Sequence, residues 1–109
     1  TEVEGFWTAW IEGQPVGCIA LKKIRKNVGE IKTMHTSPNW RRRGIASQLM
    51  EHLIAEARAS GFAQLRLETG HAEAFRPSRM FYRAFGFVPW PPYGEYIYDP
   101  FSYCMLKQI

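Results

Sequence analysis

The longest helical pattern of the chain lies between two strand-like segments, and this order constrains the fold more than any other feature. Apolar residues recur at every fourth position from Ile45 to Ala57, which predicts an amphipathic helix that stops at Gly61. Segments typical of β-strands lie before it, at residues 30–36, and after it, at residues 63–68. A strand–helix–strand unit predicts a right-handed crossover between two parallel strands of one sheet.

The N-terminal part of the chain adds further strands to this unit. Segments 6–11 and 16–21 are rich in aromatic and β-forming residues, and Glu12–Pro15 separates them, which predicts a hairpin. The basic residues between Lys22 and Lys26 are predicted to form the loop that leads to the third strand.

The C-terminal part completes the predicted order of elements. Pro77 favours the first turn of a second helix that runs to about Phe85, and strands are predicted at residues 87–88 and 101–106. The order is β-β-β-α-β-α-β-β, which predicts an α/β class, a mixed sheet with helices on its faces. The 109 residues are expected to form a single domain, residues 1–109.

Composition excludes several classes of protein. Hydrophobic residues make up 46% of the chain, so it can build a core and is not a disordered tail. No apolar run approaches the roughly 18 residues that span a membrane, and the acidic start does not resemble a secretory signal. Cys18 and Cys104 are predicted to be small buried residues in a reducing cytoplasm. The histidines show no spacing for a metal site, and none is predicted.

The residues between the third strand and the long helix predict an anion site. Gly44 lets a ligand approach the backbone closely, and the first amides of the helix have no partners inside it. The helix dipole and the three arginines of 41–43 add positive charge, so a phosphate or pyrophosphate is the natural ligand. The pattern is neither a Walker A loop nor G-x-G-x-x-G. A solvated charge run or a nucleic-acid patch is the alternative, since the net charge is +4.

Two motifs together resemble the GNAT superfamily of N-acetyltransferases. The first is R-x-x-G-x-A at Arg41–Ala46, and the second is Y-x-x-x-G-F at Tyr82–Phe87. Four further segments resemble a small bacterial branch of this family: Leu67-Glu68-Thr69-Gly70, Tyr93-Gly94-Glu95-Tyr96, Asp99-Pro100-Phe101-Ser102 and Met105-x-Lys107. The similarity extends from Gly5 to Lys107, nearly the whole chain.

The resemblance implies acetyl-CoA as the acyl donor. It implies that Arg41 and the following amides bind the pyrophosphate, and that the pantetheine arm lies between the strands that end at Thr36 and Glu68. The Met34 amide would polarise the thioester carbonyl. The implied cofactor-binding residues are Met34, His35, Thr36, Arg41, Arg42, Arg43, Gly44, Ile45, Ala46 and Ser47.

The resemblance also implies transfer of the acetyl group to a primary amine by direct attack. Tyr82 would protonate the leaving thiolate, and Glu30 would be the base, with Glu68 as the rival base. The acceptor would be a small-molecule amine or a protein amino group, and Glu95 would help to attract it. No nucleic acid and no membrane are expected as partners.

The sequence departs from the family pattern at two places. The hairpin starts almost at residue 1, without the strand and helices that usually precede it, and Phe75 occupies a position where many relatives have asparagine. We therefore keep a CoA-binding module without turnover as an alternative, and a basic nucleic-acid-binding domain as a third. The first strand would be an apolar edge, so we expect it to pair with a second copy, as a homodimer, or with a missing segment.

Overall fold

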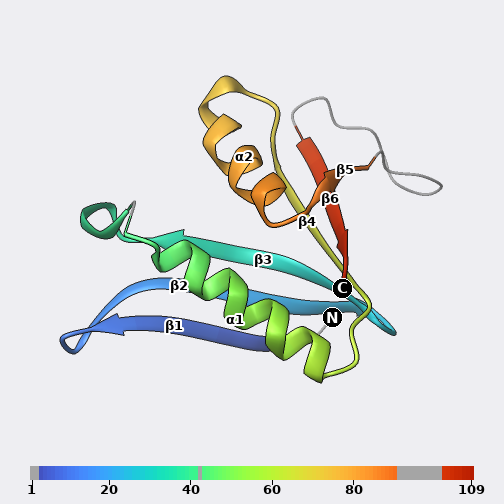
Figure 1. The fold of residues 1–109 in the computed structure, drawn as a ribbon, viewed down its shortest axis with the longest axis horizontal. Helices are drawn as coiled ribbons and strands as arrows, with labels where there is room; N and C mark the ends of the chain where they lie inside the picture. Colours follow the sequence, from blue (N-terminus) through green and yellow to red (C-terminus); the bar gives the residue numbers. More distant parts are fainter. Residues whose placement is uncertain (1–2, 42, 91–101) are drawn as a thin grey trace.

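The computed structural model describes residues 3–41, 43–90 and 102–109. It contains one six-stranded sheet in the order β1-β2-β3-β4-β6-β5 (Figure 1). The elements are β1 (Val3–Ile11), β2 (Gln14–Arg25), β3 (Val28–Thr36), η1 (Pro38–Trp40), α1 (Ile45–Ala59), β4 (Gln64–Gly70), η2 (Glu73–Phe75), α2 (Arg76–Ala84), β5 (Val88–Pro89) and β6 (Ser102–Gln108). The predicted order and the mixed α/β class are therefore confirmed.

Strand β2 is longer than its sequence predicts. The basic stretch that was expected to be a loop continues the strand, with Lys22 opposite Glu30 and Arg25 opposite Val28. The turn needs only residues 26–27, because Asn27 adopts φ +66°, a left-handed conformation that asparagine tolerates. Long cationic side chains can extend into water from such a strand, so their charge alone does not indicate a loop.

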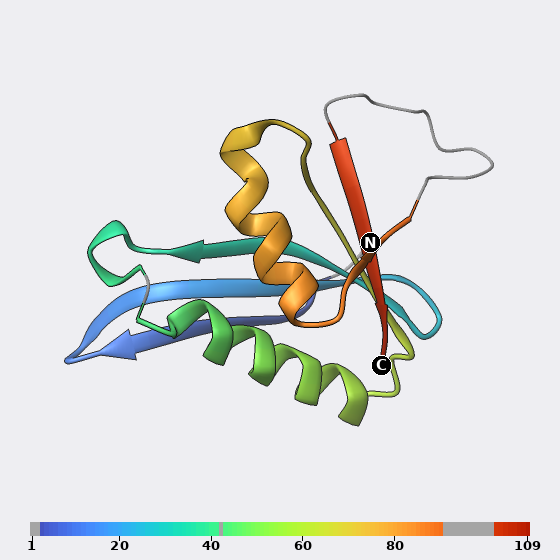
Figure 2. The same cartoon turned by 45° about the horizontal axis from the view of Figure 1, so that its top comes forward.

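Both helices lie on the same side of the sheet (Figures 1 and 2). Strand β4 is parallel to β3, and β5 is parallel to β4 with the antiparallel β6 between them. The two crossovers advance across the sheet in the same direction, so right-handed connections place α1 and α2 on one face. The expected helices on the faces of the sheet are therefore found, in the described residues, on one face alone.

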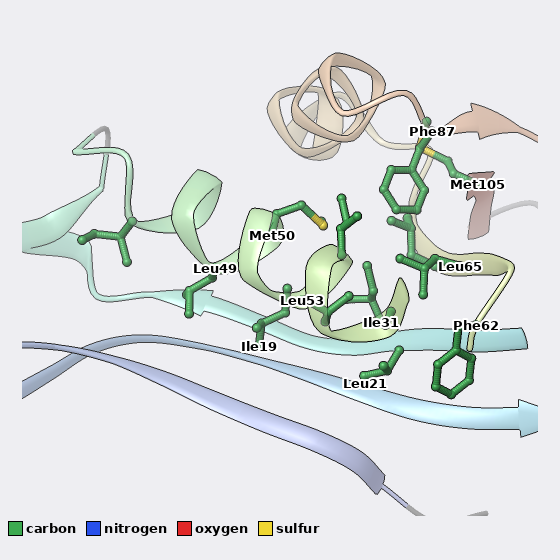
Figure 3. Close-up of a cluster of buried hydrophobic side chains, with 14 of the residues drawn as sticks. Ile19, Leu21, Ile31, Leu49, Met50, Leu53, Phe62, Leu65, Phe87 and Met105 are labelled. Carbon is green, nitrogen blue, oxygen red and sulfur yellow. The ribbon is translucent and has the colours of Figure 1, made fainter. Parts of the chain in front are cut away.

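The hydrophobic core lies between this face and α1 (Figure 3). The apolar stripe of α1 buries Leu49, Met50 and Leu53 against Ile19 of β2 and Leu65 of β4. On β4 the buried Leu65 and Leu67 alternate with more exposed neighbours, so every second residue of this strand faces away from the helices. Within the described residues, neither helix is long and apolar enough to cross a membrane.

Candidate active site

Strands β3 and β4 form a fork at the centre of the sheet. They pair only at Val28–Gln64, Gly29–Leu65 and Glu30–Arg66. Beyond these pairs β3 continues to Thr36 alongside β2, and β4 continues to Gly70 alongside β6. The divergence expected between these two strands is present, and the open end of the fork faces α2 (Figure 1).

A cavity of about 490 Å³ lies at the open end of this fork. One wall comes from β3, the following loop and α1, and the other from η2, α2 and the residues around them. The lining residues are Met34, His35, Thr36, Arg41, Ala46, Ala74, Phe75, Pro77, Ser78, Phe81 and Tyr82.

A second cavity, of about 220 Å³, lies at the N-terminus of α1. It is lined by Thr36, Trp40, Arg41, Gly44, Ile45, Ala46, Ser47 and Phe81. Four of these residues also line the larger cavity, so the two cavities adjoin. A path therefore leads from the start of α1 along the end of β3 to Tyr82.

The N-terminus of α1 has no side-chain cap among the described residues. Gly44 is the N-cap residue, with φ +79°, and none of the described side chains caps the first turn. A Cβ atom at Gly44 would meet none of the described residues within 4 Å apart from its chain neighbours, and Gly44 to Ser47 line the smaller cavity. Uncapped amides at the positive end of the helix dipole are a suitable site for an anion.

The arginines beside this helix end are placed differently from one another. Arg41 lines both cavities, and its Nε donates a hydrogen bond of 3.4 Å to the carbonyl of Thr36. The guanidinium of Arg43 lies 5.1 Å from the ring centroid of Trp40 and lines neither cavity. Arg42 lies outside the described residues, as do Glu95 and most of the two motifs between residues 93 and 102.

The hydroxyl of Tyr82 points toward β3. It donates a hydrogen bond to Sδ of Met34 at 3.9 Å, which places the proposed acid next to the strand that is expected to hold the thioester. Burial raises the pKa of Tyr82 above its ordinary value of 10.0. The hydroxyl therefore keeps its proton at neutral pH and can act as a donor.

The two glutamates lie on the face of the sheet away from the helices. Glu30 lies at the last pair before the fork opens, and Lys32 forms an ion pair with it at 3.5 Å. Glu68 accepts a hydrogen bond of 3.1 Å from Oγ of Ser102. Neither carboxylate lines the two cavities.

The negative charges of both carboxylates affect the thiol of Cys104, which lies on the same face. Burial raises the pKa of its thiol, and the negative charges of Glu68 and Glu30 raise it further. The thiol therefore stays protonated at neutral pH. Cys18 and Cys104 are both half-buried rather than fully buried as expected, because each occupies a position on this uncovered face.

Several lining residues were not predicted from the sequence. Phe81 lines both cavities, and Ala74, Pro77 and Ser78 line the larger one. The predicted helix offered a signal for three of them, because a helix places residues four positions apart on the same side, as Ser78 is to Tyr82 and Pro77 is to Phe81. Ala74 precedes that helix and had no such signal. Phe75 was noted in the sequence, but its place in the cavity wall was not.

Comparisons with known proteins place the chain in a family. Residues 1–87 match the model of the acetyltransferase (GNAT) family, and the chain belongs to this family. The chain is 42% identical over 104 residues to "Uncharacterized N-acetyltransferase YsnE" of Bacillus subtilis, a match that covers 95% of this chain and 69% of that protein.

Solved structures support the same fold. The crystal structure of an acetyltransferase from Streptococcus agalactiae is 30% identical, with a TM-score of 0.82, and the match covers 95% of this chain and 66% of that one. A GNAT family acetyltransferase from Elizabethkingia anophelis, solved with acetyl-CoA bound, has the same fold at a TM-score of 0.81 and 19% identity, over 95% of this chain and 75% of that one. The chain spans 61% to 69% of the length of the curated relatives that it matches.

Proposed function

We propose that this chain transfers an acetyl group from acetyl-CoA to a primary amine by direct nucleophilic attack. One observation carries the proposal: adjoining cavities lead from the uncapped N-terminus of α1 through the open fork to the hydroxyl of Tyr82. The open helix amides at one end of this path and the protonated hydroxyl at the other would suit an elongated thioester with a diphosphate.

The residues along the path fit acetyl-CoA as the donor. The amides of Gly44 to Ser47 would bind the diphosphate, and Arg41 and Arg43 would add positive charge. The end of β3, from Met34 to Thr36, would pair with the pantetheine arm. Acetyl-CoA bound there supplies an activated acyl group on a thiol leaving group.

We assign the base, the group that polarises the carbonyl and the acid to residues around the fork between β3 and β4. We assign Glu30 as the base that takes the proton from the ammonium of the acceptor, with Glu68 as the alternative base. The amide of Met34 would polarise the carbonyl, and Tyr82 would protonate the departing sulfur. The proximity of Tyr82 to Met34 supports placing the acid and the carbonyl-polarising amide at the same thioester.

The acceptor would approach from the face that carries the carboxylates. Burial raises the pKa of Cys104, and Glu68 and Glu30 raise it further, so the two carboxylates create a negative potential that would favour a cationic amine. Both a small-molecule amine and a protein amino group fit this chemistry. Binding of acetyl-CoA without turnover of any amine would favour the alternative, a CoA-binding module.

Replacement of Gly44 tests the anion site, and Gly13 provides a matched control. Both glycines have a positive φ (+79° and +76°) and both have open space at the Cβ position, so an aspartate brings similar strain and the same charge to each. We expect Gly44→Asp to weaken acetyl-CoA binding about tenfold or more, because the carboxylate repels the diphosphate. We expect Gly13→Asp to bind like the wild type. Calorimetry measures both, and equal affinities for the two variants would refute the site.

We also propose that β1 pairs with a second copy of the chain. This strand is an edge of the described sheet, and residues 5–11 carry no charge. Phe6 and Trp10 are 59% and 62% exposed, and both lie two positions from Thr8. A two-fold axis at Thr8 would place Phe6 of each copy opposite Trp10 of the other, an aromatic cross-strand pair.

A further inference from the structure

Arg79 of α2 binds the segment that connects β4 to this helix. Its Nη1 donates hydrogen bonds to the carbonyl oxygens of Gly70, at 2.5 Å, and Ala72, at 3.0 Å. Its guanidinium carbon lies 5.5 Å from the ring centroid of Tyr103 on β6, and the ring of His71 contacts the same tyrosine at 5.0 Å. One side chain therefore joins α2 to the end of β4 and to β6.

The segment that Arg79 holds forms one wall of the larger cavity. Ala74 and Phe75 line that cavity directly, and the ring of Phe75 packs so closely on Gly70 that a Cβ atom there would overlap it. The position of this wall therefore depends on how the segment is fixed to the end of β4. Arg79 does not line the cavity itself, so it acts on the cavity through this segment.

A neighbouring arginine on the same helix provides a contrast. Within the part of the chain that the structure describes, the polar contact of Arg76 is with the nearby Glu73, at 3.5 Å, and both side chains are exposed, so this ion pair contributes little. The bonds from Arg79 are charge-assisted and reach nine and seven residues back along the chain to another element. Arg79 is thus the better placed of the two to fix the wall.

We propose that Arg79 is a positioning residue that sets the affinity of the larger cavity for acetyl-CoA. This inference rests on the proposed function. By holding residues 70–75 against β4 and β6, Arg79 keeps Phe75 and the start of α2 at the separation from β3 that the pantetheine arm requires. It has no role in proton transfer, so its loss affects binding of the donor and leaves the chemical step unchanged.

The test compares Arg79→Met with Arg76→Met. Methionine keeps an unbranched apolar stem and removes the donors at each position. We expect Arg79→Met to raise KM for acetyl-CoA about tenfold with kcat within about twofold, and Arg76→Met to resemble the wild type. Arg79→Lys should restore part of the loss, because it keeps the charge but not the planar fork. A change in kcat at unchanged KM, or equal KM for both methionine variants, would overturn the proposal.

A second measurement separates this proposal from the proposed function. The rate of amide hydrogen exchange of residues 70–76 reports, without any substrate, how firmly this segment is held. We expect this rate to be higher in Arg79→Met than in Arg76→Met. Unchanged exchange would overturn the role of Arg79 whether or not the chain is an enzyme. If Arg79→Met exchanges faster but the wild-type chain does not bind acetyl-CoA, the proposed function and the effect on affinity are refuted. The role of Arg79 in holding the segment would then still stand.

If Arg79→Met does not fold, Gly70→Ala provides an independent route. The added Cβ overlaps the Phe75 ring and displaces the same wall without removing a hydrogen-bond donor. We expect the same rise in KM at constant kcat, and an unchanged KM would count against the wall as the determinant of affinity.

Discussion

For Tyr82, the burial of the side chain supports the chemical role that we propose. Its side chain is half-buried, its hydroxyl contacts the sulfur of Met34, and burial raises its pKa above 10.0. An acid with a pKa this high remains protonated throughout the neutral range. It can therefore donate to a thiolate as that thiolate forms, which is the state of the reaction that needs it.

We predict that Tyr82→Phe binds acetyl-CoA as the wild type does and lowers kcat by about 10²-fold. Phenylalanine keeps the ring that packs between α2 and the core and removes only the proton donor. Calorimetry and release of free thiol measure the two effects, and full turnover in the variant would remove Tyr82 from the acid role.

The pKa of Tyr82 also fixes the sign of a stability effect. Above pH 10 the unfolded chain loses the tyrosine proton while the folded chain retains it, so stability falls as pH rises through this region. Tyr82→Phe removes that contribution.

The sequence predicted individual residues only where a local motif carries the chemistry. The glycine in R-x-x-G-x-A predicted a close approach of a ligand to the backbone, and Gly44 has a positive φ and open space at the position of a Cβ atom. The hydroxyl of Tyr82 on Met34 and the ring of Phe75 on Gly70 join residues that are distant along the chain or that depend on a specific loop path. No local pattern encodes such contacts.

At the scale of elements, the fork between β3 and β4 distinguishes the two candidate bases. Glu30 lies at the last pair before the strands separate, and Glu68 lies on β4 beyond that point, held by Ser102. Of the two carboxylates, Glu30 is thus the one at the point where the strands separate. This argument favours Glu30.

We predict that Glu30→Gln lowers kcat/KM for the amine about 10²-fold, while Glu68→Gln changes it less than about threefold. Glutamine retains the size of each side chain and removes the proton acceptor. Steady-state rates across neutral pH measure both. The reverse order of effects would move the base to Glu68.

The order of elements could be predicted because hydrophobic periodicity is a local property of the sequence. The side of the sheet on which α2 lies could not, because it depends on the place of β6 between β4 and β5, which only the complete strand order defines. The length of β2 was underpredicted because a run of lysine and arginine residues resembles a loop, although here it continues the ladder to Arg25.

At the scale of the whole molecule, we predict that the chain forms a dimer through β1. Trp10→Lys places a charge on the exposed edge and should produce a monomer, because charged residues on edge strands prevent pairing. Val88→Lys is the control, since Val88 is 51% exposed on β5 at the other edge of the described sheet. Sedimentation measures the mass, and a wild-type chain that stays at 12.6 kDa at all concentrations would contradict the prediction.

The placement of α1 and α2 on one side of the sheet has a consequence for how two reactants could meet. The cavities are lined by β3, α1 and α2, whereas the carboxylates lie on the opposite face of the sheet. In the proposed function, donor and acceptor would thus arrive by separate routes and occupy the molecule together. Neither has to depart before the other enters, so a three-component complex, rather than an acylated protein, is the species from which product would form.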